Sequence, residues 1–102
     1  MSNIPSAPNT PPEPASRQDT LIEYPSAFPI KAMGLKHDDL VPVVTGIARK
    51  HDPFFDDATI ELRESQTGKY LGVTITITAT SREQLDAIYR ELSSHELIQV
   101  VL

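Results

Sequence analysis

Residues 70–80 read Tyr70-Leu71-Gly72-Val73-Thr74-Ile75-Thr76-Ile77-Thr78-Ala79-Thr80, where apolar side chains alternate with hydroxyl-bearing ones. A period of two is typical of a β-strand that buries one face and exposes the other. Ser81-Arg82-Glu83-Gln84 then forms a capping box, and Leu85, Ile88, Tyr89 and Leu92 share one helical stripe behind it. Residues 97–102 are mostly apolar and predict a short strand. The whole stretch therefore predicts one strand, helix and strand unit.

A second unit of the same kind precedes the first. Residues 27–33 alternate as a strand, which we expect to end at Gly34. A helix is expected to follow with Asp39 as its N-cap, because this choice puts Pro42 at the third helical position, where no N–H is needed. Gly46 inside this helix costs about 1 kcal/mol against alanine, so we expect it to permit a close contact.

The complete order is strand, helix, strand, strand, helix, strand, with the second strand at residues 58–65. Right-handed crossovers then predict an α+β fold, the ferredoxin-like βαββαβ sandwich: a four-stranded antiparallel sheet with two helices on one face. The first and third strands are expected in the middle of the sheet. The side chains expected to face the helices are Phe28, Ile30, Ile60, Leu62, Val73, Ile75, Ile77, Ile98 and Val100.

Composition limits the domain to residues 23–102. Residues 1–22 hold five prolines among Ser, Asn, Thr and Ala, and they have too little apolar surface to offset the entropy of ordering, so we expect a disordered tail. Neither a secretory signal nor a membrane-spanning run is recognisable, and cysteine is absent. We therefore expect a cytoplasmic protein without disulfides and without a membrane partner.

The pattern of charged and aromatic residues argues against nucleic acid and against catalysis. The net charge is −5, and the open sheet face is expected to carry Lys31, Met33, Glu61, Arg63, Thr74, Thr76, Thr78 and Gln99 instead of base-stacking aromatics. The sequence shows neither a catalytic nucleophile paired with a general base nor a phosphate-binding loop. His51, Asp52, Asp56 and Asp57 match no ligand spacing and are expected to be solvated. We expect no enzyme activity, no cofactor and no metal.

Two segments are candidates for binding. The connection into the first helix is expected to present backbone N–H groups that suit an anionic or zwitterionic ligand, although a capping aspartate beside a solvated neighbour is the simpler interpretation. Its residues are Gly34, Lys36, His37, Asp38 and Asp39. The second segment is the last edge strand, which carries one polar residue and could pair with a partner or a second copy. Its residues are Leu97, Ile98, Gln99, Val100, Val101 and Leu102.

The chain also resembles a known family. The block Phe28-Pro29-Ile30-Lys31-Ala32-Met33-Gly34 and the block Ile88-Tyr89-Arg90-Glu91-Leu92 are similar to the YbeD-like family of small bacterial proteins of unknown function. The resemblance covers nearly all of residues 23–102 and implies a ferredoxin-like fold similar to ACT regulatory domains, which bind small effectors. Two functions are therefore considered: a non-enzymatic regulatory module that binds a metabolite at the turn, or alternatively an adaptor that binds a protein through a sheet edge or the open face.

Overall fold

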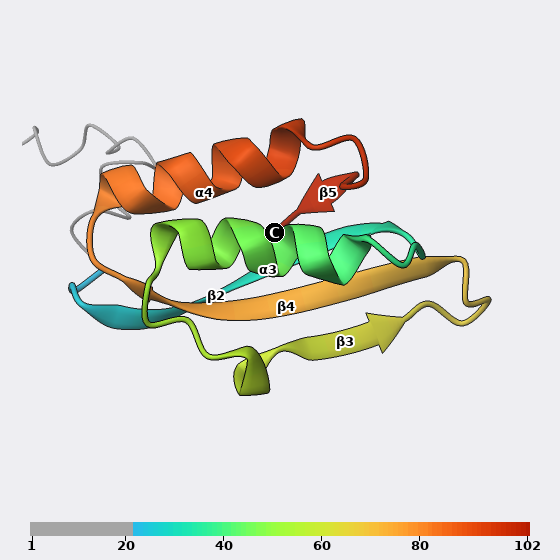
Figure 1. Ribbon diagram of the computed structural model, residues 1–102, viewed down its shortest axis with the longest axis horizontal. Coiled ribbons are helices and arrows are strands. Elements are labelled where there is room, and N and C mark those ends of the chain that lie inside the picture. Colours follow the sequence, from blue (N-terminus) through green and yellow to red (C-terminus); the bar gives the residue numbers. More distant parts are fainter. Residues whose placement is uncertain (1–21) are drawn as a thin grey trace, which may run out of the picture.

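The computed structural model describes residues 22–102. The tail expected over residues 1–22 lies outside this range except for Ile22, so its disorder stays a prediction. Figure 1 shows the described elements in chain order. They are β2 (Ser26–Leu35), α3 (Leu40–His51), the 3₁₀ turn η1 (Asp57–Thr59), β3 (Glu61–Glu64), β4 (Tyr70–Ala79), α4 (Arg82–Ser94) and β5 (Val100–Val101).

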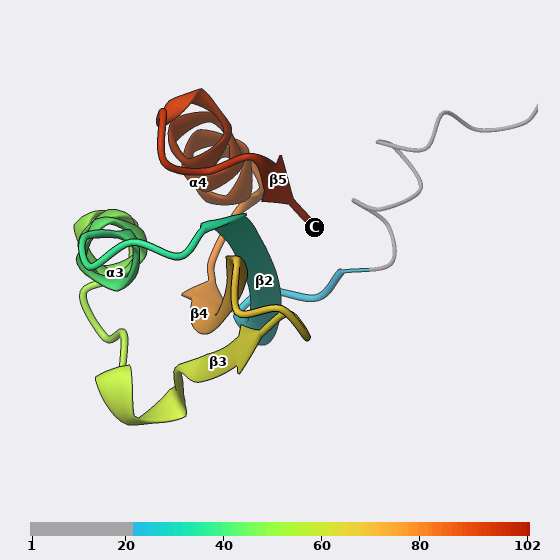
Figure 2. The same ribbon diagram turned by 90° about the vertical axis from the view of Figure 1, so that its right-hand side faces the viewer.

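The sheet has the order β3-β4-β2-β5, and every neighbouring pair is antiparallel. Figure 2 shows both helices on one side of this sheet, and among the described elements none covers the other side, which is called the open face. The arrangement confirms the predicted ferredoxin-like sandwich, with β2 and β4 in the middle. The two central strands pair from Ser26↔Ala79 to Leu35↔Tyr70, with Ile30 opposite Ile75.

The core lies between the sheet and the two helices, as the period-two alternation predicted. Ile30, Ile75 and Ile77 from the central strands are at most 1% exposed, and they pack with Val44 of α3 and Ile88 of α4. Because residues two apart in a strand share a face, the intervening threonines of β4 point to the open face. The sequence therefore assigned the two faces of β4 correctly.

The first strand is longer than expected, and Gly34 does not end it. Gly34 pairs with Leu71 inside the ladder, and β2 continues to Leu35. A Cβ atom at position 34 would overlap the backbone carbonyl oxygen of Leu97, which passes directly over the glycine. The glycine is needed here for a close backbone approach and not for a turn.

Helix α3 begins where expected, with Asp39 as its N-cap, but the expected side-chain hydrogen bond is missing. Asp39 occupies the N-cap position, yet its carboxylate accepts no hydrogen bond from the first turn. Pro42 is the third helical residue, as predicted. The expectation for Gly46 was wrong, because a Cβ atom there would meet nothing within 4 Å. Gly46 lies on the exposed surface of α3, where a larger side chain would fit without touching another element.

The two edge strands are shorter than expected. Leu62 lies opposite Val73 on the helix side, but it is 56% exposed because the helices do not extend over β3. The last strand is shifted by one residue: Val100 opposes Met33 on the open face, whereas Val101 packs against the core. The cause is a bend before the strand, where the N–H of Ile98 donates to the carbonyl of His95 at 3.0 Å. This bend buries Ile98 and resets the alternation.

A cluster of buried polar side chains, here called the polar joint, connects the end of α3 to β4 and α4, and no sequence pattern predicted it. Asp52 was expected to be solvated, but it is 2% exposed. Its carboxylate accepts the N–H groups of Phe54 at 3.0 Å and Thr78 at 2.8 Å. The amide of Gln84 donates to the carbonyls of His51 at 3.0 Å and Thr78 at 3.1 Å. Burying this carboxylate is tolerated because both its oxygens are hydrogen-bonded.

The N-terminus of α4 supports half of the predicted capping box. The Ser81 Oγ accepts the N–H of Gln84 at 3.0 Å, as predicted. The Gln84 Oε1 accepts the N–H of Thr80 at 2.7 Å, whereas a complete box would use the N–H of Ser81. The Gln84 side chain therefore serves both the cap and the polar joint.

Two glycine substitutions should change stability in opposite directions. Gly34→Ala should lower the free energy of unfolding by about 1 to 3 kcal/mol, because the new methyl group must displace the backbone of Leu97. Gly46→Ala should raise it by up to about 1 kcal/mol, because alanine favours the helix and has free space there. Urea denaturation measures both. A Gly34→Ala midpoint equal to that of the unchanged protein would contradict the close approach of Leu97.

Candidate functional site

The candidate ligand turn and the candidate interface segment lie against each other. The Leu97 carbonyl over Gly34 brings residues 95–97 beside the connection from β2 to α3. The two segments line one shallow depression of about 510 Å³. Its lining residues are His37, Asp39, Pro42, Val43, His95, Glu96 and Leu97. Of the predicted interface segment only Leu97 lines this depression, next to His95 and Glu96, which belonged to neither predicted site.

Both histidines of the depression are held by the same local hydrogen bond. The Nδ1 atom of His37 accepts the N–H of Asp39 at 2.9 Å, and the Nδ1 atom of His95 accepts the N–H of Leu97 at 3.1 Å. An Nδ1 acceptor requires the neutral ring that carries its proton on Nε2. Within residues 22–102 neither Nε2 atom has a hydrogen-bond partner, so each ring offers a free donor.

The remaining lining residues supply the complementary chemistry. Asp39 and Glu96 are exposed carboxylates, while Pro42, Val43 and Leu97 form an apolar wall. Carboxylates accept hydrogen bonds from an ammonium group, and the imidazole N–H groups donate to a carboxylate or carbonyl oxygen. The depression can therefore bind a small molecule that carries both kinds of group.

The predicted turn residues differ in their positions relative to this depression. His37 and Asp39 line it, whereas Gly34 is buried in β2 beneath Leu97. Lys36 instead forms an ion pair with Glu64 at 2.8 Å, and Asp38 is exposed outside the lining. The backbone N–H of Lys36 also donates to the carbonyl of Lys69 at 2.9 Å, which orients the turn.

Sequence reasoning missed His95 and Glu96 as site residues. His95 is the C-cap of α4. Its position beside His37 depends on contacts between residues 58 positions apart, which no local pattern reveals. The two histidines share one local feature, which the structure shows: the Nδ1 atom of each accepts the backbone N–H of the residue two positions later.

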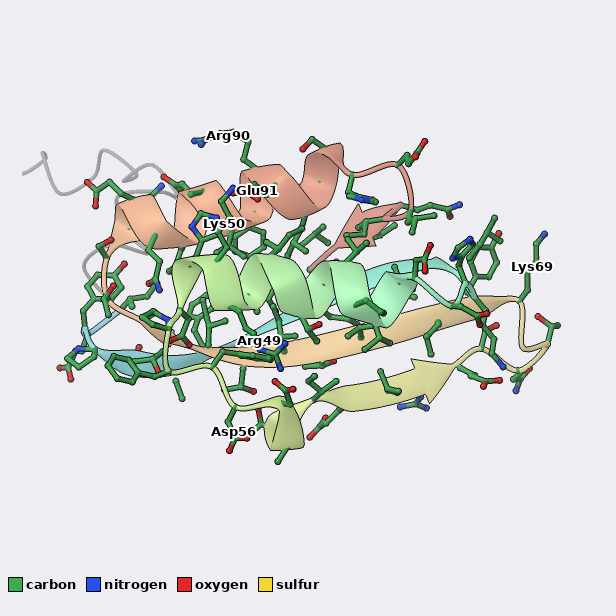
Figure 3. The ribbon with its side chains drawn as sticks, in the orientation of Figure 1. Arg49, Lys50, Asp56, Lys69, Arg90 and Glu91 are labelled. Carbon is green, nitrogen blue, oxygen red and sulfur yellow. The ribbon has the colours of Figure 1, made fainter. Side chains whose placement is uncertain are left out.

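A groove between the two helices continues from the depression. It is lined by Pro42, Val43, Gly46, Ile47, Lys50, Glu91, Ser94 and His95, of which three also line the depression. Gly46 leaves room in its floor. Figure 3 shows Lys50 and Glu91 close together between α3 and α4.

Glu91 forms ion pairs with two basic residues of α3 at this groove. Its carboxylate accepts from the Lys50 Nζ at 3.0 Å and lies 2.5 Å from the His51 Nε2. These hydrogen bonds, that of Lys50 first and that of His51 second, lower the pKa of Glu91 from its ordinary value. The side chain of Glu91 is 32% exposed, so solvent screens both contacts. Glu91 is therefore already paired and is a poor candidate for binding a ligand.

The acidic loop after α3 has structural roles. Asp56 accepts the N–H of Ala58 at 2.9 Å at the start of η1, and Asp57 pairs with Arg49. Among residues 22–102, three or more His, Asp or Glu side chains are nowhere arranged to hold a metal ion. Over the same residues neither helix has the length and hydropathy needed to cross a membrane.

Comparison with known proteins identifies relatives of this chain. Residues 19–102 match the model of the family described as "Protein of unknown function (DUF493)". A UPF0250 protein from Janthinobacterium sp. (strain Marseille) is 55% identical over 84 residues, which cover 82% of this chain and 92% of the relative. The UPF0250 protein RSc0326 from Ralstonia nicotianae is 45% identical over 102 residues, with complete coverage of both chains.

A solved structure shows a similar fold. The solution structure of protein HP0495 from H. pylori superposes with a TM-score of 0.67 and covers 100% of this chain and 98% of that one. Its sequence is only 14% identical, so the similarity concerns the fold alone. The comparisons confirm the expected family of small bacterial proteins and the ferredoxin-like fold.

The Glu91 ion pairs should make stability depend on acidic pH. Because folding lowers the pKa of Glu91, its contribution is complete above the ordinary value of 4.5 and is lost as pH falls through the folded value. Glu91→Gln should therefore be less stable than the unchanged protein at about pH 7, and the difference should shrink at about pH 3. Urea denaturation at both pH values measures it. Glu83→Gln, which changes an exposed residue of the same helix, is the control, and an equal effect of both substitutions would contradict the pairing.

Proposed function

The chain belongs to the DUF493 family, and we propose that it is a non-enzymatic regulatory module that binds a small metabolite in the depression beside α3. The observation that carries the proposal is the pair of anchored histidines. His37 precedes α3 and His95 follows α4, both line the same depression, and within residues 22–102 neither Nε2 atom has a hydrogen-bond partner. Such donors suit an oxygen-bearing ligand.

The ligand class follows from the other lining residues. Asp39 and Glu96 place two carboxylates beside the imidazole donors, and Val43 and Leu97 add a small apolar surface. A zwitterion of amino-acid size matches this set, with its ammonium group on the carboxylates and its carboxylate on an Nε2–H. The resemblance to ACT regulatory domains favours the same class of ligand.

Regulation is favoured over catalysis because the depression lacks a catalytic arrangement. Among its lining residues, neither histidine faces a nucleophile at hydrogen-bond distance, and each Nδ1 is occupied by a backbone N–H. Binding alone is consistent with this arrangement. A ligand that joins residues 37–39 to residues 95–97 would stabilise the contact between the start of α3 and the segment before β5.

A thermal-shift screen of the common amino acids tests the proposal. A ligand at about 100 times its dissociation constant should stabilise the protein by about 2.7 kcal/mol and raise its melting temperature. His37→Ala and His95→Ala should each abolish that rise. Asp38→Asn is the matched control, because it changes the same turn outside the lining and should retain the rise. Absence of any rise, or an unchanged rise in both histidine variants, would refute the site.

An adaptor that acts through the last strand is the second candidate, and one observation favours it. Val100 and Leu102 are 46% and 66% exposed at the edge of the sheet. The edge itself is short: Leu102 and Lys31 exchange both backbone hydrogen bonds, at 2.8 and 3.1 Å, so Val101 is the residue whose backbone groups face away from β2. Exposed apolar side chains therefore support this candidate more than free backbone groups do.

Sedimentation over a concentration series tests the second candidate. If the edge joins two copies, Val100→Lys should shift the dimer toward monomer, because Val100 is exposed and its change should not disturb the core. Val101 is unsuitable, since it packs against the core. Leu62→Lys on the opposite edge is the control and should leave the dimer intact. A monomer at every concentration would remove self-association through this edge.

A further inference from the structure

A hollow on the open face of the sheet has Gly72 as its floor. Gly72 lies near the start of β4, between Met33 of β2 and Arg63 of β3. The hollow has a volume of about 200 Å³ and is lined by Lys31, Met33, Arg63, Glu64, Ser65, Tyr70 and Gly72. It lies on the face opposite the helices, so the sheet separates it from the depression at His37 and His95.

The fold itself does not require glycine at position 72. Its φ is not positive, and the nearest atoms to an added Cβ would be the Arg63 oxygen and the Met33 Cγ, both at 3.6 Å. These are ordinary contact distances, so alanine fits. Glycine inside a strand costs about 0.5 to 1 kcal/mol relative to alanine. What the glycine provides in return is the space of the hollow.

Two cationic side chains beside this space lack an ionic partner. Within residues 22–102, neither Lys31 nor Arg63 has a carboxylate within ion-pair distance. Glu64 also lines the hollow, but its carboxylate is paired with Lys36 at 2.8 Å. Two unpaired cations around a small concave space favour an anionic group.

The other walls of the hollow are apolar or aromatic. The Met33 thioether chain lies beside the glycine floor, and the Tyr70 ring forms another wall. The Lys69 ammonium lies 5.5 Å from the centre of that ring, on which it makes a cation–π contact. A flat apolar group can pack against the methionine and the ring while its anionic substituent reaches Lys31 and Arg63.

We propose that the Gly72 hollow is a binding site for a small planar ligand that carries a carboxylate or a phosphate. The guanidinium of Arg63 suits either anion, because its parallel N–H groups match two oxygens. The site is independent of the proposed metabolite depression. It uses other residues on the other face of the sheet, and either site can be present without the other.

NMR titration of the full chain tests the site with four probes. These are phenylacetate, phenyl phosphate, benzyl alcohol and inorganic phosphate, each added up to about 10 mM at fixed ionic strength, which detects dissociation constants near 1 mM. Phenylacetate, phenyl phosphate or both should shift the amide signals of Gly72 and Tyr70. Benzyl alcohol lacks the anion and inorganic phosphate lacks the ring, so both should bind at least tenfold more weakly.

Substitutions then connect binding to the hollow. Gly72→Val should fill it and weaken binding at least tenfold while the melting temperature stays equal or rises, and Gly72→Ala provides a smaller filling. Lys31→Gln with Arg63→Gln should weaken binding at least tenfold without unfolding the chain. Thr76→Val, on the same face but outside the lining, is the control and should bind as the unchanged protein does.

Each outcome of the titration decides the proposal. Binding by the carboxylate alone or by the phosphate alone supports it and identifies the anion. Three results overturn it: no signal shift with either aromatic anion, equal affinity for inorganic phosphate, or undiminished binding to both folded Gly72 variants. Because no depression residue is changed, these results leave the metabolite site at His37 and His95 to its own test.

Discussion

The rest of the structure depends on the antiparallel pairing of β2 with β4, which runs from Ser26↔Ala79 to Leu35↔Tyr70. This ladder fixes which side chains face the helices, because a slip of one residue would exchange the two faces of a strand. The same ladder also determines where the two candidate sites lie. Gly34 and Gly72 lie in neighbouring pairs of the ladder, and each marks the place where one face of the sheet lacks a side chain. At Gly34 the missing side chain leaves room for the backbone of Leu97, and at Gly72 it leaves a hollow on the open face.

The two ends of the helical layer use polar groups differently. At the end where α3 stops, Asp52 and Gln84 satisfy each of their hydrogen bonds within the protein, and they join α3, β4 and α4. At the end where α3 begins, the histidines use only Nδ1, and their Nε2 atoms have no partner in the part of the chain that the structure describes. Satisfied polar groups stabilise a fold, whereas unsatisfied ones at a concave surface are available to a ligand. This difference is why we propose the metabolite site at the beginning of α3.

The two faces of the sheet also differ in charge. The depression beside α3 combines carboxylates with imidazole rings, while the hollow on the open face combines two cations with an aromatic residue. The net charge of −5 does not describe either surface, since four of the eight described lysines and arginines are paired with nearby carboxylates and four are not. Local pairing therefore decides which charges remain for a ligand. Lys31 and Arg63 are important because, within residues 22–102, neither has a carboxylate within ion-pair distance, and Glu64 beside them is paired with Lys36.

The sequence alone determined the fold, the order of the strands, the inner face of β4 and the Ser81 cap of α4. Those properties follow from alternation, capping and handedness, which act over a few residues or apply to every chain. Only the tertiary structure decided the environment of Asp52, the role of Gly34 and the position of His95 beside His37, because each requires the positions of residues far apart in sequence. It also decided the register of β5. A strand of two residues has too little pattern to set its own alternation, so the burial of Ile98 before it sets the register instead.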